Sequence, residues 1–127
     1  MATRSVQPSP IVEAFLNDIA DCPEFMGLPR PGVNSIGGFG NSPLKIAAVR
    51  GDVAAIEALV QAGADLNALN EHGCTALHHA VAQGHYSAAS RLVELGALLT
   101  IRDQFGHLPA DNALTPELKA LFSGRRQ

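Results

Sequence analysis

The sequence predicts an all-α solenoid, in which short helix–turn–helix units stack side by side into one domain. Three observations support this fold class. Glycine recurs at intervals of 33 residues, at Gly40, Gly73 and Gly106. Helix-start signals recur at the same interval, and the apolar residues between them follow helical spacing. Because one such unit cannot bury its own apolar face, several must stack to form a core.

Each central unit opens with a helix-start signal. Ser42 and Thr75 are equivalent, and a side-chain oxygen at such a position accepts a hydrogen bond from an N–H of the first helical turn. Pro43 follows at the first helical position, where its missing N–H costs nothing. Ala47 and Ala80 keep these first helices thin enough to pack closely against their neighbours.

A second helix is predicted in each central unit, after a glycine turn. We expect these helices to run from about 53 to 62 and from about 86 to 95. Both should end at a glycine, Gly63 and Gly96, because glycine enters the left-handed C-cap conformation without a Cβ penalty.

The two ends of the chain are predicted to be atypical capping units, which a solenoid needs to cover its inner repeats. Ser9 should cap a helix from about 10 to 20 that buries three apolar residues, Ile11, Phe15 and Ile19. The second helix of this unit should be short, because prolines interrupt the segment at Pro23, Pro29 and Pro31. Thr115 should cap a last helix that ends near Phe122.

We therefore expect one domain between short flexible ends. The expected division is a flexible N-terminus (1–9), a degenerate capping repeat (10–36), two full repeats (37–69 and 70–102), a truncated capping repeat (103–122) and a flexible tail (123–127).

These motifs resemble the ankyrin-repeat family, whose repeat is 33 residues long and whose signature reads T-P-L-H-x-A. The segment Thr75-Ala76-Leu77-His78 follows that signature, and the resemblance extends over 37–113. Lys45 stands where the family prefers histidine, Ala76 replaces its proline, and Leu108 replaces its threonine cap. The resemblance implies a non-catalytic protein-binding module that acts through its loop tips and inner helices.

Composition disfavours several other functions. The net charge is −3 and the nine basic residues are scattered, whereas nucleic-acid binding needs a concentrated basic face. No apolar run approaches the ~18 residues that would span a membrane. Two cysteines without an apolar signal segment favour a reducing, cytoplasmic location. We expect no cofactor, nucleic acid or membrane partner.

Catalytic and metal-binding sites are also disfavoured, although four histidines and one cysteine lie within 72–85. The resemblance implies that His78 and His85 bond to the backbone of neighbouring loops. His79 should pack within the stack. Three loop residues are left over, His72, Cys74 and His107, and without a carboxylate or a C-x-x-C motif they make a weak zinc signal. Metal binding through these side chains remains a weakly supported alternative, and catalysis is less favoured still.

The expected partner-binding surface consists of loop-tip and inner-helix residues. These are Phe39, Asn41, Arg50, Leu69, Glu71, His72, Cys74, Gln83, Arg102, Gln104, Phe105 and His107. Phe39, His72 and Phe105 are equivalent positions of units spaced about 10 Å apart, so they should form a row. Aromatic residues and arginine dominate interface energetics. The alternative is that both phenylalanines fold back onto the terminal units.

We expect the partner to be another protein, which the chain would occupy as an inhibitor, adaptor or assembly factor, since its sequence contains only the repeat array. It is similar to the very small ankyrin proteins that bacteria use as immunity or inhibitor proteins against a toxin or enzyme. The alternative is a scaffold or regulatory subunit that binds a partner without blocking it. An exposed aromatic row could serve a monomer or a homodimer.

Overall fold

The computed structural model describes residues 9–28 and 31–123. Most of the predicted flexible ends, and Pro29, lie outside these ranges. The described residues form six α-helices and two short 3₁₀-helices, with no strand. None of these helices is both long and apolar enough to cross a membrane.

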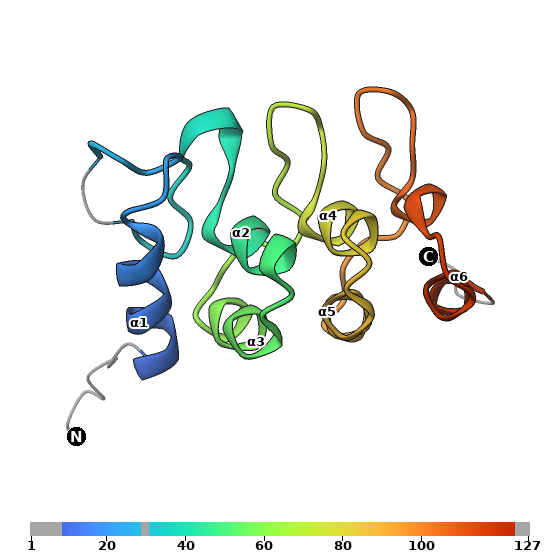
Figure 1. The fold of residues 1–127 in the computed structure, drawn as a ribbon, viewed down its shortest axis with the longest axis horizontal. Helices are drawn as coiled ribbons and strands as arrows, with labels where there is room; N and C mark the ends of the chain where they lie inside the picture. Colours follow the sequence, from blue (N-terminus) through green and yellow to red (C-terminus); the bar gives the residue numbers. More distant parts are fainter. Residues whose placement is uncertain (1–8, 29–30, 124–127) are drawn as a thin grey trace, which may run out of the picture.

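The helices form two rows (Figure 1). The inner row consists of α2 (Pro43–Arg50), α4 (Ala76–Ala82) and the 3₁₀-helix η2 (Pro109–Asn112). The outer row consists of α3 (Val53–Gln61), α5 (Tyr86–Glu94) and α6 (Pro116–Phe122). Helices pack against their neighbours within each row, and α1 (Pro10–Ile19) covers α2 and α3 at the N-terminal end. The predicted all-α solenoid is confirmed.

Side-chain caps start the helices where the sequence indicates. Ser42 Oγ accepts from the N–H of Lys45 at 3.3 Å, and Thr75 Oγ1 accepts from the N–H of His78 at 3.3 Å. Thr115 does the same for α6. The predicted helix starts are therefore confirmed, and each rests on a bond made within the first turn.

The N-terminal unit differs from the expectation in two ways. Residues 20–28 form turns, without the short second helix, and the side chain of Phe25 is buried in the hydrophobic core. Ile11 is 48% exposed, so its predicted burial is wrong. The buried face of α1 instead comprises Val12, Phe15, Leu16 and Ile19. This face has the i, i+3, i+4, i+7 spacing of one helical stripe, and Ile11 lies beside it.

The inner helix of the C-terminal unit is reduced to η2. Leu108 at its start has no side-chain oxygen, and its N–H donates instead to Asp111 Oδ2 at 2.8 Å. Leu118 and Leu121 of α6 are buried against the preceding unit. The inner helix of the last unit is therefore shorter than those of the central units, and its start lacks the side-chain cap that Ser42 and Thr75 provide there.

Three loops project above the inner row (Figure 1), and we call them finger 1 (37–41), finger 2 (70–74) and finger 3 (103–107). The N–H of each first residue donates to the carbonyl of the last at 2.9–3.0 Å, which closes each finger. The fingers are also joined to one another. The N–H of Glu71 donates to Phe39 O at 3.0 Å, and that of Gln104 donates to His72 O at 2.8 Å.

Each finger contains a glycine in the left-handed conformation, and in fingers 1 and 2 this glycine also lets the next finger approach. Gly40, Gly73 and Gly106 have φ of 72°, 75° and 82°. A Cβ on Gly40 would lie 2.9 Å from the backbone N of Glu71, whereas a Cβ on Gly106 would have no neighbour within 4 Å. Gly40 is therefore required for its conformation and for the close approach, and Gly106 for its conformation alone.

We expect Gly106→Ala to lower the free energy of unfolding by about 1 kcal/mol, the cost of a left-handed alanine. Gly40→Ala should lower it by about 2–4 kcal/mol, because finger 2 must also move. Urea denaturation followed by circular dichroism would measure both. Equal losses would contradict the close approach of the two fingers.

Candidate functional site

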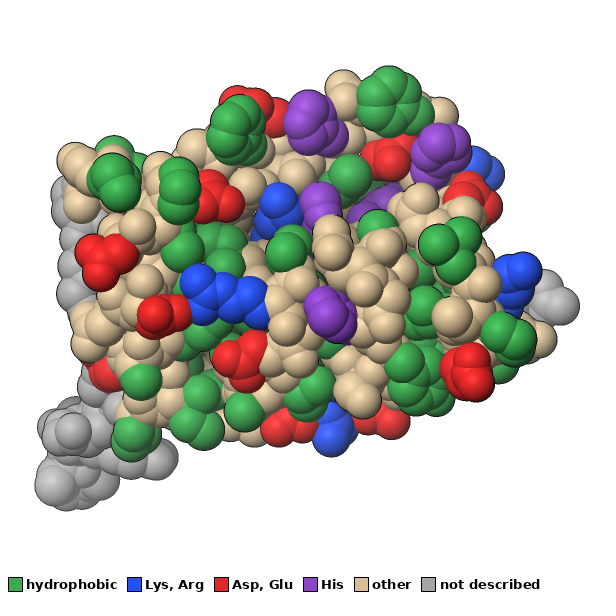
Figure 2. Space-filling model, in the orientation of Figure 1, with side chains coloured by type: hydrophobic (Ala, Val, Ile, Leu, Met, Phe, Trp, Pro, Cys, Tyr) green, Lys and Arg blue, Asp and Glu red, His purple; other side chains and the backbone are tan. Residues whose placement is uncertain are grey.

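Two aromatic rings stand exposed at the finger tips. Phe39 is 65% exposed and Phe105 is 73% exposed, and His72 between them is also exposed. Figure 2 shows hydrophobic and histidine side chains along the edge above the helices. The alternative in which both phenylalanines fold back onto the terminal units is therefore wrong. Phe105 is only loosely shielded by His107, whose ring centroid lies 6.4 Å away.

Finger 1 differs from the others in its backbone. Phe39 has φ of 62°, a left-handed value, and no other non-glycine residue of the described chain has a positive φ. This conformation costs an L-residue roughly 1–2 kcal/mol. A large aromatic side chain therefore occupies a position where glycine would be less strained. Retained strain of this kind is typical of functional positions.

Side-chain bonds fix finger 3 against finger 2. The side-chain Nε2 of Gln104 lies 2.8 Å from His72 Nδ1, beside the backbone bond between the same residues. Within finger 3, Asp103 Oδ1 accepts from the N–H groups of Phe105 and His107 at 2.9 and 3.0 Å. These two hydrogen bonds lower the pKa of Asp103, and the bond from the N–H of His107 has the larger effect. The tip rings are thus carried on hydrogen-bonded loops.

Asn41 does not belong to the exposed surface, which corrects its predicted role. Its side chain is 4% exposed, and its Oδ1 accepts from Asn70 Nδ2 at 3.3 Å. Asn70 Oδ1 in turn accepts from the N–H groups of His72 and Cys74. Asn70 was missed by the sequence analysis, although an Asn at the start of a loop, three residues before Gly73, indicates a turn stabilised by its side chain.

His79 completes this polar network. Its Nε2 lies 3.3 Å from Asn70 Nδ2. Because Asn70 Oδ1 already accepts two backbone N–H bonds, the amide group presents its N–H donors to His79. The Nε2 atom of His79 must therefore carry no proton, so that it can accept this bond. Burial lowers the pKa of His79 from 6.5 to about 4, and the positive charges of Lys45, His78 and His72 add to this effect.

The other two histidines have the structural roles that the resemblance implied. His78 is buried, and its Nε2 lies 3.0 Å from the carbonyl O of His107 at the base of finger 3. The Nε2 of His85 lies 2.9 Å from Val49 O at the end of α2. Each ring joins two units of the stack.

Cys74 is half-buried, with Sγ 4.0 Å from Asp103 Oδ2. Burial, and then the Asp103 carboxylate, raise the pKa of its thiol, so the thiol is held in its less nucleophilic form. Among residues 9–28 and 31–123, no group of three or more His, Cys, Asp or Glu could hold a metal ion.

The predicted arginines are engaged within the chain. Arg50 pairs with Asp18 and lies over the ring of Phe15, 5.6 Å from its centroid. The side-chain hydrogen bond to Asp18 raises the pKa of Arg50. Arg102 donates to Gly106 O at 2.9 Å within finger 3. The remaining predicted residues are exposed, namely Leu69, Glu71, Gln83 and Gln104.

The geometry therefore comprises three joined fingers with exposed rings, above a row of inner helices. A family model described as ankyrin repeats (3 copies) matches residues 1–103. No curated protein matches the chain. The family match ends at finger 3, just before the unit whose inner helix is shortened to η2.

We expect the histidine network to make stability depend on pH. Between pH 6.5 and 4 the unfolded chain binds a proton at residue 79 that the folded chain does not, so acid lowers the free energy of unfolding. The contribution of this half-exposed ring, after solvent screening, should be about 1–2 kcal/mol. Denaturation of wild type and His79→Gln across this range would measure it. A His79→Gln curve as steep as that of wild type would contradict the assignment.

We expect Phe39→Gly to be at least 1 kcal/mol less destabilising than Phe105→Gly, the equivalent change at a position without positive φ. Glycine relieves the strain in finger 1, whereas in finger 3 it only adds freedom to the unfolded chain. Thermal denaturation of the two variants provides the comparison. Equal effects would show that Phe39 is not strained.

Proposed function

Because the chain belongs to the ankyrin-repeat family, whose repeats form protein-binding surfaces, we propose that its fingers and inner helices bind another protein without covalent chemistry. The observation that carries this proposal is the pair of phenylalanine rings at the finger tips, 65% and 73% exposed. Exposed aromatic rings on a folded surface are typical of interaction sites, and aromatic residues supply much of the energy of interfaces.

The hydrogen bonds between the fingers support the same proposal. The bonds from Glu71 to Phe39 and from Gln104 to His72 set the spacing of the tips before any partner arrives. A surface that is already ordered loses little conformational freedom on binding. The proposed contact set is therefore the exposed part of the predicted one, Phe39, Leu69, Glu71, His72, Gln83, Arg102, Gln104, Phe105 and His107, with Arg50 at its edge.

We propose further that the chain covers the active cleft of its partner, an enzyme or toxin, and so inhibits it, as an immunity protein does. The projecting fingers support this role, because loops that extend beyond the helices can enter a partner's cleft (Figure 1). A scaffold would bind the same surface and leave turnover intact. The two unpaired cysteines are consistent with action in a reducing compartment such as the cytoplasm.

Affinity capture from a lysate of the native host, with identification by mass spectrometry, would test the surface. Wild type should retain a protein that the variant Phe39→Ala/His72→Ala/Phe105→Ala loses, because the three tip side chains supply the central contacts. Turnover of the captured protein would then separate inhibition from scaffolding.

The matched control is Tyr86→Ala/Leu98→Ala/Leu114→Ala, which removes exposed apolar side chains outside the fingers. This control should capture as wild type does, and circular dichroism should show both variants folded. Equal capture by all three proteins would refute the role of the finger tips.

A further inference from the structure

A pocket of about 230 Å³ lies between the N-terminal unit and α2, and is open to solvent. Its walls are formed by Cys22, Glu24, Lys45, Ile46, Val49 and Arg50. The volume is far above the ~10–15 Å³ that one water molecule requires, so a side chain fits. Figure 2 shows Lys and Arg side chains over the region of α2, with hydrophobic side chains between them.

Lys45 is the unusual member of this pocket. It stands at the position equivalent to His78, whose ring bonds to the base of the next finger. Lys45 is half-buried, yet no carboxylate of the described chain lies within ion-pair distance of its ammonium group. A half-buried cation that no carboxylate contacts directly is costly, because the charge of nearby Glu24 offsets only part of its desolvation, and an anion that entered the pocket would offset more of this cost.

Two other cationic side chains on the helices, Arg91 and Arg50, already have carboxylate partners. Arg91 pairs with Glu57 and Glu94 on the outer row. Arg50 pairs with Asp18, and its Nη2 also lies 3.3 Å from Cys22 Sγ. These contacts hold the Arg50 guanidinium in place at the pocket wall, while a guanidinium has further N–H groups to donate.

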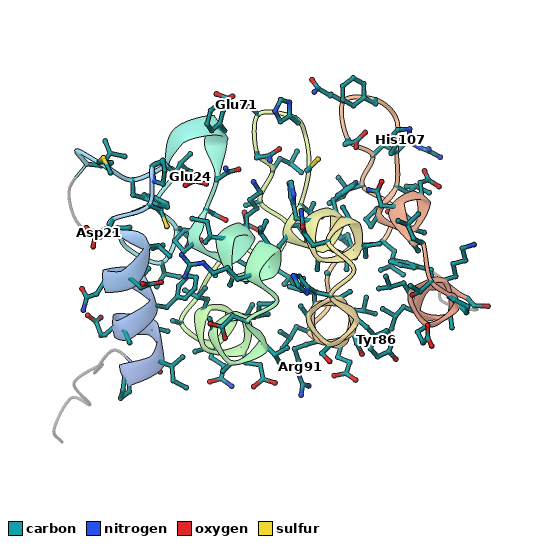
Figure 3. The ribbon with its side chains drawn as sticks, in the orientation of Figure 1. Asp21, Glu24, Glu71, Tyr86, Arg91 and His107 are labelled. Atoms are coloured by element: carbon teal, nitrogen blue, oxygen red, sulfur yellow. The ribbon has the colours of Figure 1, made fainter. Side chains whose placement is uncertain are left out.

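We propose that this pocket receives a glutamate side chain of the protein partner, whose carboxylate pairs with Lys45 and whose methylene groups contact Ile46 and Val49. This inference rests on the proposed function and names one feature of the partner. The apolar walls favour a side chain with an aliphatic stem over a free inorganic anion. Four of the lining residues belong to α2 of the inner row, and Glu24, which is labelled in Figure 3, accepts a hydrogen bond at its carbonyl O from the N–H of Gly38 in finger 1. A partner that covers the finger tips can therefore reach the pocket.

The electrostatics of the pocket agree with this assignment. Burial lowers the pKa of Lys45 by more than the nearby Glu24 and Cys74 raise it, so the ammonium is incompletely compensated. A partner carboxylate would remove this deficit. Glu24 is the competing charge, because it partly neutralises Lys45 and repels an incoming anion.

The test uses a tripeptide, acetyl-Ala-Glu-Ala-amide, titrated into the ¹⁵N,¹³C-labelled protein and followed by NMR. We expect saturable shifts of the Ile46 and Val49 methyl signals at millimolar peptide, the affinity expected of one such contact. The Gln analogue of the peptide should give at least tenfold weaker binding. Lys45→Met should abolish the shifts. Lys119→Met, which removes an exposed cation on α6, should leave them unchanged.

The variant Glu24→Gln gives an independent test that leaves the ammonium group of Lys45 in place. It should tighten binding of the Glu peptide about threefold, because one repulsive carboxylate is lost. Equal binding of the Glu and Gln peptides, or full binding by a folded Lys45→Met variant, would overturn the proposal. Sodium acetate that binds as tightly as the peptide would also overturn it, since the site would then serve free anions.

This experiment is independent of the finger-tip test. No natural partner is used, so the tripeptide can bind normally even if the tip variant captures every protein that wild type does. Conversely, a captured partner that binds Lys45→Met as tightly as wild type would overturn the glutamate proposal and leave the role of the tips intact.

Discussion

Stacking at a fixed register is the constraint on which this molecule depends. No helix pair here buries its own apolar face, so α2 and α3 need α1 on one side and α4 and α5 on the other. Small side chains such as Ala47 and Ala80, both fully buried, allow that approach. The same register places the backbone of each finger within hydrogen-bonding distance of the next, so order in the fingers follows from packing in the rows below.

The surface for recognition arises from this arrangement. Since backbone groups and partly buried side chains such as Asn70 and His79 hold the fingers together, the outermost side chains are not needed for folding. Phe39 and Phe105 can therefore be exposed without loss of the scaffold. The core below is apolar as usual, whereas polar residues at repeat positions fix the fingers and leave the two tip rings exposed.

Two unusual residues lie in the first full repeat. Phe39 adopts a left-handed backbone, and Lys45 replaces the histidine that would have bonded to the neighbouring finger. Both changes cost stability locally, and both provide a side chain that the regular repeat would lack. Leu108, in the last unit, has only a structural consequence, because its side chain cannot cap the short helix η2. Local violations of folding rules with a functional benefit are expected at binding sites.

The sequence by itself determined the repeat period and the helix starts at Ser42, Thr75 and Thr115, because each depends on residues within about four positions or on exact repetition. The tertiary structure decided that the rings of Phe39 and Phe105 are exposed and do not fold back onto the terminal units. Only the tertiary structure decided that Asn41 is buried on Asn70, that Arg50 pairs with Asp18, and that Lys45 borders a pocket. These contacts join residues of neighbouring units that lie about thirty positions apart. Local pattern carries no information on how closely two such side chains approach, since packing between units sets that distance.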